Sequence, residues 1–323
     1  MNTVLSICIP TYNRSLFLKT NLQSLISIVR KFEIPIYVSD NCSVDNTENV
    51  VQNLQEDYAF LFYDKNKVNK GADFNFEKVL KMSEAKYAWL LGDDDSIDGK
   101  FFESVLKVLE QNELDLLVVN GGNTNLKRVR DTETQMYVDP SKLLNDIGWH
   151  MQWMSCLIYS RDLIDKADFL KYQNTNLLQY GIIFDYLAKK ESIKVYWEKA
   201  VVVYNLTNSS ESEASVSWAE NTFWIFTKSW YQVIHGFPAC YSEAAKRKCI
   251  MDHGYKSELF NFKGLIKLSL QGIFNLKTLN EYSFYIKQTI KYKRPVLILI
   301  ACLPTVNKKF FLSIRRFYQN FIK

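Results

Sequence analysis

The chain has 323 residues, of which 47% are hydrophobic and 23% charged, with only 11 glycines and 6 prolines. These proportions fit a globular protein and exclude collagen-like, low-complexity and disordered classes. The length suits one large domain or a domain with an extension. Nine of the 40 basic residues follow the last acidic residue, Glu281, which leaves 31 basic against 35 acidic residues upstream. The slight excess of acidic residues up to Glu281 predicts no nucleic-acid partner. The basic residues after it favour binding to an anionic membrane surface.

The cysteines and the start of the sequence point to the reducing cytoplasm. None of the six cysteines forms a CxxC pair, and we expect no secretory signal because no basic segment followed by an apolar stretch opens the chain. Cysteines without such a framework are typical of intracellular proteins. The longest apolar run, residues 296–303, is far shorter than the ~20 residues of a membrane-spanning helix. Three scattered histidines predict no imidazole metal centre.

The first 120 residues alternate between apolar strand-like runs and segments with helical spacing. The predicted strands are residues 4–9, 36–38, 60–62, 87–91 and 114–119. The predicted helices are residues 18–29, 45–54, 73–82 and 101–109. Strands that alternate with helices indicate an α/β fold, with a mostly parallel sheet and helices on both faces.

Beyond residue 120 the pattern is weaker. Strands are predicted at residues 156–159, 193–197 and 201–204, a helix at 177–189 and a loop at 207–217. From residue 218 the sequence is aromatic and helical in character. We therefore expect a body over residues 1–217 and a helical extension over residues 218–323.

Polar clusters follow three of the predicted strands, where ligands bind in sheets of this kind. They are residues 10–14 (PTYNR), 39–41 (SDN) and 92–95 (GDDD). Adjacent carboxylates repel each other, and Mg²⁺ or Mn²⁺ binds through carboxylate oxygens while keeping positions for substrate phosphates. The aspartate trio, Asp93, Asp94 and Asp95, therefore favours a metal and phosphate site over the alternative of a solvated acidic turn.

Asp40 has two interpretations. Its carboxylate could accept hydrogen bonds from a pyrimidine ring or a ribose, or it could stabilise a local turn or cap a helix, as we expect for Asp45. The sequence contains no GxGxxG, GxxxxGK[ST] or GxSxG pattern. A dinucleotide site, a P-loop and a hydrolase nucleophile elbow are therefore not predicted.

Four short segments in this order resemble family 2 glycosyltransferases of the GT-A fold. They are the PTYNR segment, the run that begins at Asp40, residues 69–71 (NKG) and the GDDD segment, and the resemblance covers residues 3–120. Residues 89–95 (WLLGDDD) resemble the abequosyltransferase-like branch, which builds bacterial O-antigen and capsule sugars. The resemblance implies a GT-A fold with a nucleotide-sugar half at 1–120 and an acceptor half at 121–217.

The resemblance also implies a nucleotide-diphosphate sugar donor and a Mn²⁺ or Mg²⁺ cofactor. Asp93 and Asp95 satisfy the D-x-D pattern of the metal ligands, although three acids in a row permit more than one alignment, and Asp94 is the alternative ribose contact. The residues expected to bind the donor are Pro10, Thr11, Tyr12, Arg14, Asp40, Gly71, Asp93 and Asp94.

Members of this family invert the sugar and use an acidic residue at the start of a helix as the base. Asp185 is the candidate here, although the family usually has an acidic pair or a Gly-Glu-Asp at this place and this chain has Ile183, Phe184 and Asp185. The alternative is an exposed helical aspartate. Residues 204–210 lack the histidine that many relatives place near the metal, so either the acids and the diphosphate suffice, or this loop serves the acceptor.

Residues 306–323 form an amphipathic pattern with an aromatic face and a basic face. Such a helix either lies in a membrane interface or packs its phenylalanines on the body. We expect the interface, at the cytoplasmic face of the inner membrane, where a lipid-linked saccharide acceptor would be anchored. The competing functions are a sugar nucleotidyltransferase and a non-catalytic sugar- or membrane-binding scaffold.

Overall fold

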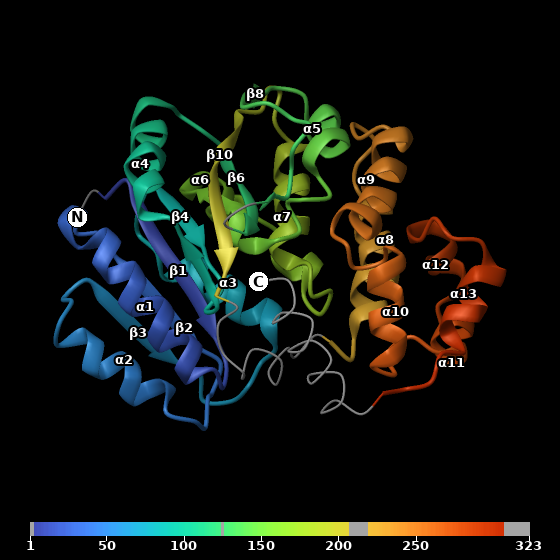
Figure 1. Cartoon of the computed structure of the whole chain (residues 1–323). Helices are drawn as coiled ribbons and strands as arrows, with labels where there is room; N and C mark the ends of the chain where they lie inside the picture. Colours follow the sequence, from blue (N-terminus) through green and yellow to red (C-terminus); the bar gives the residue numbers. More distant parts are fainter. Residues whose placement is uncertain (1–2, 124–125, 207–218, 307–323) are drawn as a thin grey trace. The chain divides into compact units, whose positions relative to one another are not determined.

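The computed structural model describes residues 3–123, 126–206 and 219–306 (Figure 1). The chain divides into two compact units. The first comprises residues 1–215 and 236–246, and the second comprises residues 216–235 and 247–323. The predicted boundary between residues 217 and 218 lies close to this division, and the structure adds residues 236–246 to the first unit.

The first unit begins with the predicted alternation of strands and helices, which is confirmed. Each predicted apolar run of this part became a strand, and β1 and β4 are buried along their whole length because both of their faces are covered. The elements are β1 (Leu5–Thr11), α1 (Ser15–Val29), β2 (Ile36–Asp40), α2 (Thr47–Gln55), β3 (Leu61–Lys65), α3 (Ala72–Met82) and β4 (Tyr87–Leu90).

The later part of the unit departs from the prediction at two of its strands, and it also contains short strands and helices that were not predicted. The predicted strands at 193–197 and 201–204 are one strand, β10 (Val195–Asn205), with an irregular register between Glu198 and Val202. A three-residue strand that was not predicted, β5 (Asp95–Ile97), begins inside the acidic segment. The other elements are α4 (Phe102–Gln111), β6 (Leu116–Asn123), β7 (Leu126–Lys127), β8 (Gln135–Tyr137), α5 (Pro140–Ile147), β9 (Leu157–Ser160), α6 (Arg161–Lys166) and α7 (Leu178–Leu187).

The main strands of the described sheet lie in the order β3-β2-β1-β4-β9-β6-β10-β5. β1 pairs in parallel with β2 and β4, and β6 pairs in parallel with β10. β9 is antiparallel to both β4 and β6, so β4 and β6 run in the same direction. The carboxyl ends of β1, β2, β4, β6 and β10 therefore meet at one edge of the sheet.

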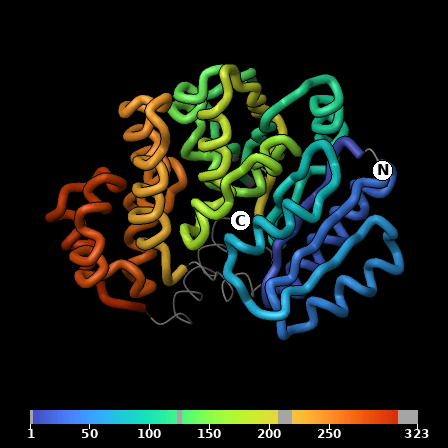
Figure 2. Tube along the Cα trace, turned by 180° about the vertical axis from the view of Figure 1, so that it is seen from behind, coloured from blue at the N-terminus to red at the C-terminus, as the bar shows by residue number. Residues whose placement is uncertain are grey.

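Helices cover both faces of this sheet, as predicted (Figures 1 and 2). Leu22 of α1, Val51 of α2 and Phe102 of α4 join one apolar core with the inward side chains of the strands. Helices α3, α6 and α7 pack on one another at the other face. Burial of these helix faces fixes the sheet and leaves its carboxyl edge for polar side chains.

The second unit is helical, as the sequence predicted. Its elements are η5 (Trp224–Ser229), a π-helical turn, α8 (Trp230–His235), most of α9 (Glu243–Lys256), α10 (Phe262–Leu270), α11 (Leu276–Glu281), α12 (Ser283–Thr289) and α13 (Arg294–Ala301). Phe223, Phe260 and Phe274 pack at its centre. The predicted loop at 207–217 and almost all of the predicted helix at 306–323 lie outside the described residues. No helix in the described part of the chain is long and apolar enough to span a bilayer.

Candidate active site

The loop after β1 is fixed to the loop after β2. Asn13 has a positive φ of 54°, its backbone N–H donates to Ser43 Oγ at 2.8 Å, and its Oδ1 accepts from the Val44 N–H at 2.8 Å. The carboxylate of Asp45 accepts from the backbone N–H groups of Ser15 and Thr47. Asp45 thus stabilises the starts of both α1 and α2, which extends the capping role predicted for it.

Asp40 ends β2 directly beside Thr11 in the sheet register and is fully buried. Its Oδ1 accepts from the Ser43 N–H at 2.8 Å, and its Oδ2 accepts from the Tyr63 hydroxyl at 2.7 Å. Burial, followed by the bond to Asp40, raises the pKa of Tyr63. The turn-stabilising alternative is therefore present in the structure. A carboxylate has further lone pairs, so these two bonds do not use its full capacity as a hydrogen-bond acceptor.

Gly71 lies at the same edge, immediately before α3, and has a positive φ of 89°. The Asn41 amide donates to Asn69 Oδ1 at 2.8 Å and to the Gly71 carbonyl at 3.1 Å. Asn41 therefore holds the 69–71 segment against the end of β2. A Cβ at Gly71 would meet nothing within 4 Å, so the requirement for glycine here is conformational.

Arg14, which follows β1, forms ion pairs with two members of the aspartate trio. Its two terminal nitrogens donate to Asp93 Oδ1 at 2.7 Å and to Asp94 Oδ2 at 2.6 Å. The Thr11 hydroxyl donates to the other oxygen of Asp93 at 2.7 Å. Pro10 is buried, whereas 40% of the Tyr12 side chain surface is exposed at the edge. Two of the predicted residues of this loop, Thr11 and Arg14, therefore contact the acidic segment.

Asp95 is held from the opposite side. Its Oδ2 accepts from Trp153 Nε1 at 2.9 Å and from the Ser155 hydroxyl, and its Oδ1 accepts from the Asn205 amide at 3.2 Å. The amide of Asn21 donates to the backbone carbonyls of Gly92 and Asp95 and so fixes the turn itself. Sequence reasoning missed these four side chains. A polar residue within the apolar pattern of α1 was the signal at Asn21.

Burial is the largest cause of the abnormal acidity of the trio. It raises the pKa of Asp93 to about 7, with Arg14 acting in the opposite direction. Burial and the neighbouring charge of Asp94 raise the pKa of Asp95 to about 6. Burial also opposes the charge of Arg14, but Asp93 and Asp94 outweigh it and raise the pKa of the guanidinium. The edge therefore concentrates negative charge that one arginine balances only in part.

The donor set fits a divalent cation in part. Carboxylate oxygens are suitable ligands for Mn²⁺ or Mg²⁺, and among the described residues no basic side chain pairs with Asp95. Asp93, in contrast, already pairs with Arg14. In the described part of the chain no three His, Cys, Asp or Glu side chains are grouped to hold a metal. A cation here would therefore need ligands from the substrate.

Asp185 lies apart from this cluster. It is buried in the last turn of α7, so the alternative of an exposed helical aspartate is wrong. Lys171 Nζ donates to its Oδ2 at 2.6 Å. The first turn of α7 is held by Asp73, which accepts from the Leu178 N–H. Asp185 stands seven residues further on, about 10 Å along the helix axis. No described contact joins it to the trio.

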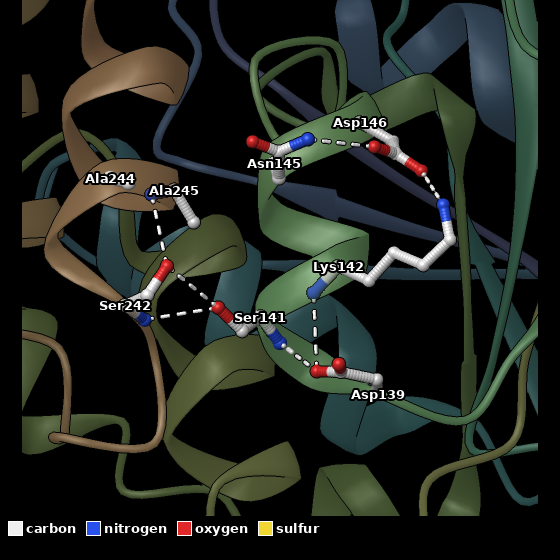
Figure 3. Close-up of a pocket in the computed structure, with 8 residues that line it drawn as sticks. All are labelled: Asp139, Ser141, Lys142, Asn145, Asp146, Ser242, Ala244 and Ala245. Carbon is white, nitrogen blue, oxygen red and sulfur yellow. Dashed lines mark hydrogen bonds and ion pairs between the residues drawn. The ribbon is translucent and has the colours of Figure 1, made fainter.

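A pocket elsewhere in the first unit contains none of the predicted site residues (Figure 3). It lies between the start of α5 and residues 242–245. Asp139 accepts from the backbone of Ser141 and Lys142 and so caps α5, and the hydroxyls of Ser141 and Ser242 are 3.2 Å apart. Its polar groups satisfy one another, and we assign the candidate site to the strand edge instead.

The Glycosyl transferase family 2 model matches residues 6–167 of the chain. Abequosyltransferase RfbV of Salmonella typhimurium is 28% identical over 228 residues, which are 64% of this chain and 68% of that protein. The GalNAc(5)-diNAcBac-PP-undecaprenol beta-1,3-glucosyltransferase of Campylobacter jejuni is 35% identical over 94 residues, which are 29% of this chain and 30% of that protein.

Two of the solved structures that resemble this chain match most of its length. S. aureus TarS 1–349 in complex with UDP-GlcNAc has a TM-score of 0.61 and 17% identity, and the match covers 92% of this chain and 84% of that chain. Mannosyltransferase PcManGT from Pyrobaculum calidifontis, in complex with GDP-Man and Mn²⁺, has a TM-score of 0.55 and 12% identity, with coverage of 92% and 82%. These likenesses confirm the predicted GT-A fold.

Proposed function

The chain belongs to Glycosyl transferase family 2, and from this premise we propose that it transfers a sugar from a nucleotide-diphosphate donor to a saccharide acceptor in bacterial surface-polysaccharide synthesis. Membership of this family makes it a glycosyltransferase, and neither the nucleotidyltransferase nor the scaffold alternative holds. The observation that carries the proposal is the strand edge at which Arg14, Asp93 and Asp94 form one ion-paired group beside Thr11.

The donor lies across this edge in our proposal. The nucleotide base is held by Pro10, Thr11, Tyr12 and Asp40. The exposed ring of Tyr12 offers a stacking surface, and Asp40 offers a hydrogen-bond acceptor. Support comes from the names of the similar structures, which contain UDP-GlcNAc and GDP-Man.

The sugar and phosphate end of the donor reaches the next strand end. Asp94 accepts from the ribose, since a quarter of its side chain is exposed, whereas that of Asp93 is almost fully covered. Arg14 and the backbone at Gly71 complete the donor contacts. The positive φ at Gly71 leaves open space above the backbone for a ligand to approach.

Asp95, with Asp93 as predicted, is our proposal for the metal ligands. When bound, Mn²⁺ or Mg²⁺ would stabilise the negative charge of the departing diphosphate. Asp95 carries a negative charge without a described basic partner, whereas Asp93 can join it only when Arg14 releases one oxygen. The similar mannosyltransferase structure contains Mn²⁺, which supports this choice of ion.

Asp185 is the residue that we propose as base, and the resemblance alone supports this role. In an inverting transfer, the acceptor hydroxyl loses its proton to a carboxylate on the face of the sugar opposite the leaving group. The ion pair with Lys171 must open before Asp185 can take up that proton. The role of Asp185 as base therefore requires that this ion pair can open, which substitution of either residue can test.

We propose a lipid-linked saccharide acceptor at the cytoplasmic face of the inner membrane. The name of the similar C. jejuni enzyme, a transferase acting on an undecaprenol-linked saccharide, supports such an acceptor. In our division of labour, residues 1–120 bind the donor, 121–217 the acceptor, and 218–323 attach the enzyme to the membrane through the predicted interface helix at 306–323.

Helix α13 supports the membrane contact independently of that predicted helix. Leu297 and Ile300 face the core of the second unit, whereas Val296, Ile298 and Leu299 are exposed, Leu299 by 72%. Lys291, Lys293 and Arg294 are exposed immediately before this apolar face, and no acidic residue follows Glu281 in the sequence. An exposed apolar face that follows three basic residues directly in the sequence is complementary to an anionic bilayer.

A screen of nucleotide sugars tests the proposal. The purified protein is incubated with UDP-, GDP-, dTDP- and CDP-linked sugars and Mn²⁺, and both thermal stabilisation and release of the nucleoside diphosphate are measured. We expect one donor to stabilise the protein and to be slowly hydrolysed, and Asp95→Asn to abolish the metal-dependent part of both signals. Asp131→Asn, which removes an exposed carboxylate, is the control. Failure of every donor would contradict the proposal.

A further inference from the structure

Arg128 is a half-buried cation that lies against two aromatic rings at the strand edge. It follows the β6–β7 hairpin, and its backbone N–H donates to the Gly121 carbonyl at 2.6 Å. Its guanidinium carbon lies 5.1 Å from the ring centre of Trp149 and 5.6 Å from that of Trp153. Two cation–π contacts fix the guanidinium in place and compensate part of its lost hydration.

No described carboxylate forms an ion pair with Arg128, in contrast to Arg14, which pairs with two. Burial lowers the pKa of Arg128 to about 10. Arg128 is half-buried, and a charge partly withdrawn from water without a partner is costly. The two rings therefore hold a positive charge ready for an anion that the described chain does not supply.

The position of Arg128 connects it with the candidate site. Trp153, one of the two rings against it, donates its Nε1–H to Asp95 at 2.9 Å. β6 ends at the same edge of the sheet as β1 and β4, because both β4 and β6 are antiparallel to β9. A Cβ at Gly121 would lie 2.3 Å from a carbon of the Trp153 ring, so this glycine permits the close packing of that ring. Arg128 is thus separated from Asp95 by one ring, that of Trp153, and Asp95 is the member of the trio that forms no ion pair with Arg14.

We propose that Arg128 binds a diphosphate group of a substrate. A planar guanidinium matches phosphate oxygens with two parallel hydrogen bonds, and the two rings hold it in one orientation. The inference rests on the proposed function for the source of the group. The diphosphate belongs either to the nucleotide-sugar donor or to the lipid carrier of the acceptor, and the chemistry of recognition is the same for both.

The test measures binding of inorganic pyrophosphate to the full chain by titration calorimetry, without turnover. We expect Arg128→Met to weaken pyrophosphate binding at least tenfold, and Arg128→Lys to weaken it several-fold while it keeps the charge and the fold. Arg130→Met is the matched control, since Arg130 is a neighbouring exposed arginine. Equal affinity in the wild type and both Arg128 variants, or an equal loss in the Arg130 variant, would overturn the proposal.

Two further measurements identify the source of the diphosphate. A parallel loss of nucleoside diphosphate affinity in Arg128→Lys assigns the group to the donor. Unchanged nucleoside diphosphate affinity with a raised KM for a diphosphate-linked lipid acceptor assigns it to the acceptor, and either result supports the proposal. A wild type that binds neither pyrophosphate nor nucleoside diphosphate counts against the proposed function as well, whereas normal binding by the Arg128 variants counts against the role of Arg128 alone.

Discussion

Replacement of Arg14 by methionine tests whether the acidic edge depends on a single cation. In the described part of the chain, Arg14 is the basic residue within ion-pair distance of the aspartate trio, through contacts of 2.7 and 2.6 Å. About 20% of the Arg14 side chain and 5% of the Asp93 side chain are exposed, so water replaces the lost partner poorly. Removing one member of a buried pair typically costs about 3–5 kcal/mol.

We therefore expect Arg14→Met to lower the free energy of unfolding by about 3 kcal/mol, since the pair is not fully buried. At about 2–4 °C per kcal/mol, the thermal midpoint of the first unit should fall by about 6–12 °C. The measurement is thermal unfolding followed by circular dichroism in a buffer with a metal chelator.

The double variant Arg14→Met, Asp93→Asn separates charge from packing. Neutralising Asp93 removes the carboxylate that lost its partner, so the double variant should unfold at a higher temperature than Arg14→Met alone. Equal midpoints for the wild type and Arg14→Met would refute the reasoning, because the arginine would then contribute nothing to the balance of charge. Equal losses in the single and double variants would show that packing of the side chain on Phe17 was responsible.

Three other predictions concern pH, the base and the membrane. Because burial raises the pKa of Asp93 from 3.8 to about 7, the folded protein keeps a proton that the unfolded chain releases, and stability should fall by about 4 kcal/mol as the pH rises from 4 to 7. In urea unfolding, the stability of Asp93→Asn should not show this fall with pH. The same pH profile in the wild type and the variant would contradict the prediction. Asp185→Asn should abolish sugar transfer but preserve the affinity for the donor. Lys171→Met breaks the same ion pair and should keep transfer. Transfer activity in the Asp185→Asn variant would exclude Asp185 as the base. Leu299→Glu should reduce co-flotation with phosphatidylglycerol vesicles, and Leu170→Glu, at an 84% exposed site of the first unit, should not; equal flotation of both variants argues against the α13 contact.

The arrangement of polar side chains after β1, β2 and β4 could be predicted because these side chains follow buried strands directly. Apolar runs that alternate with helices fix the direction of β1, β2 and β4, and direction alone brings residues 10–14, Asp40 and the aspartate trio to one edge. The cap at Asp45 was also predictable, since side-chain acceptors at helix starts act over two or three residues. Each of these patterns is local in the sequence, and the parallel arrangement of the strands brings the residues together.

The other half of the site depends on contacts between residues that are distant in the chain. Asp95 bonds to Trp153 and Ser155, about 60 residues away, and to Asn205, which is 110 residues away. Strand β5 has only three residues and gains its order from the antiparallel pairing with β10. Neither periodicity nor composition carries such information. The surroundings of Arg128 could not be predicted for the same reason, because the two rings that contact it come from a later segment.

The three aspartates have different physical roles because they are held from different sides. Asp93 turns towards β1 and is neutralised by Arg14, whereas Asp95 turns towards β9 and β10 and is stabilised by uncharged donors alone. The Asn21 amide donates to the carbonyls of Gly92 and Asp95 and so stabilises the turn that separates the two side chains. A cation that binds here must either meet Asp95 with substrate oxygens or take Asp93 from Arg14. In the second case Arg14 becomes free to pair with a phosphate, so metal and donor would strengthen each other's binding at this edge.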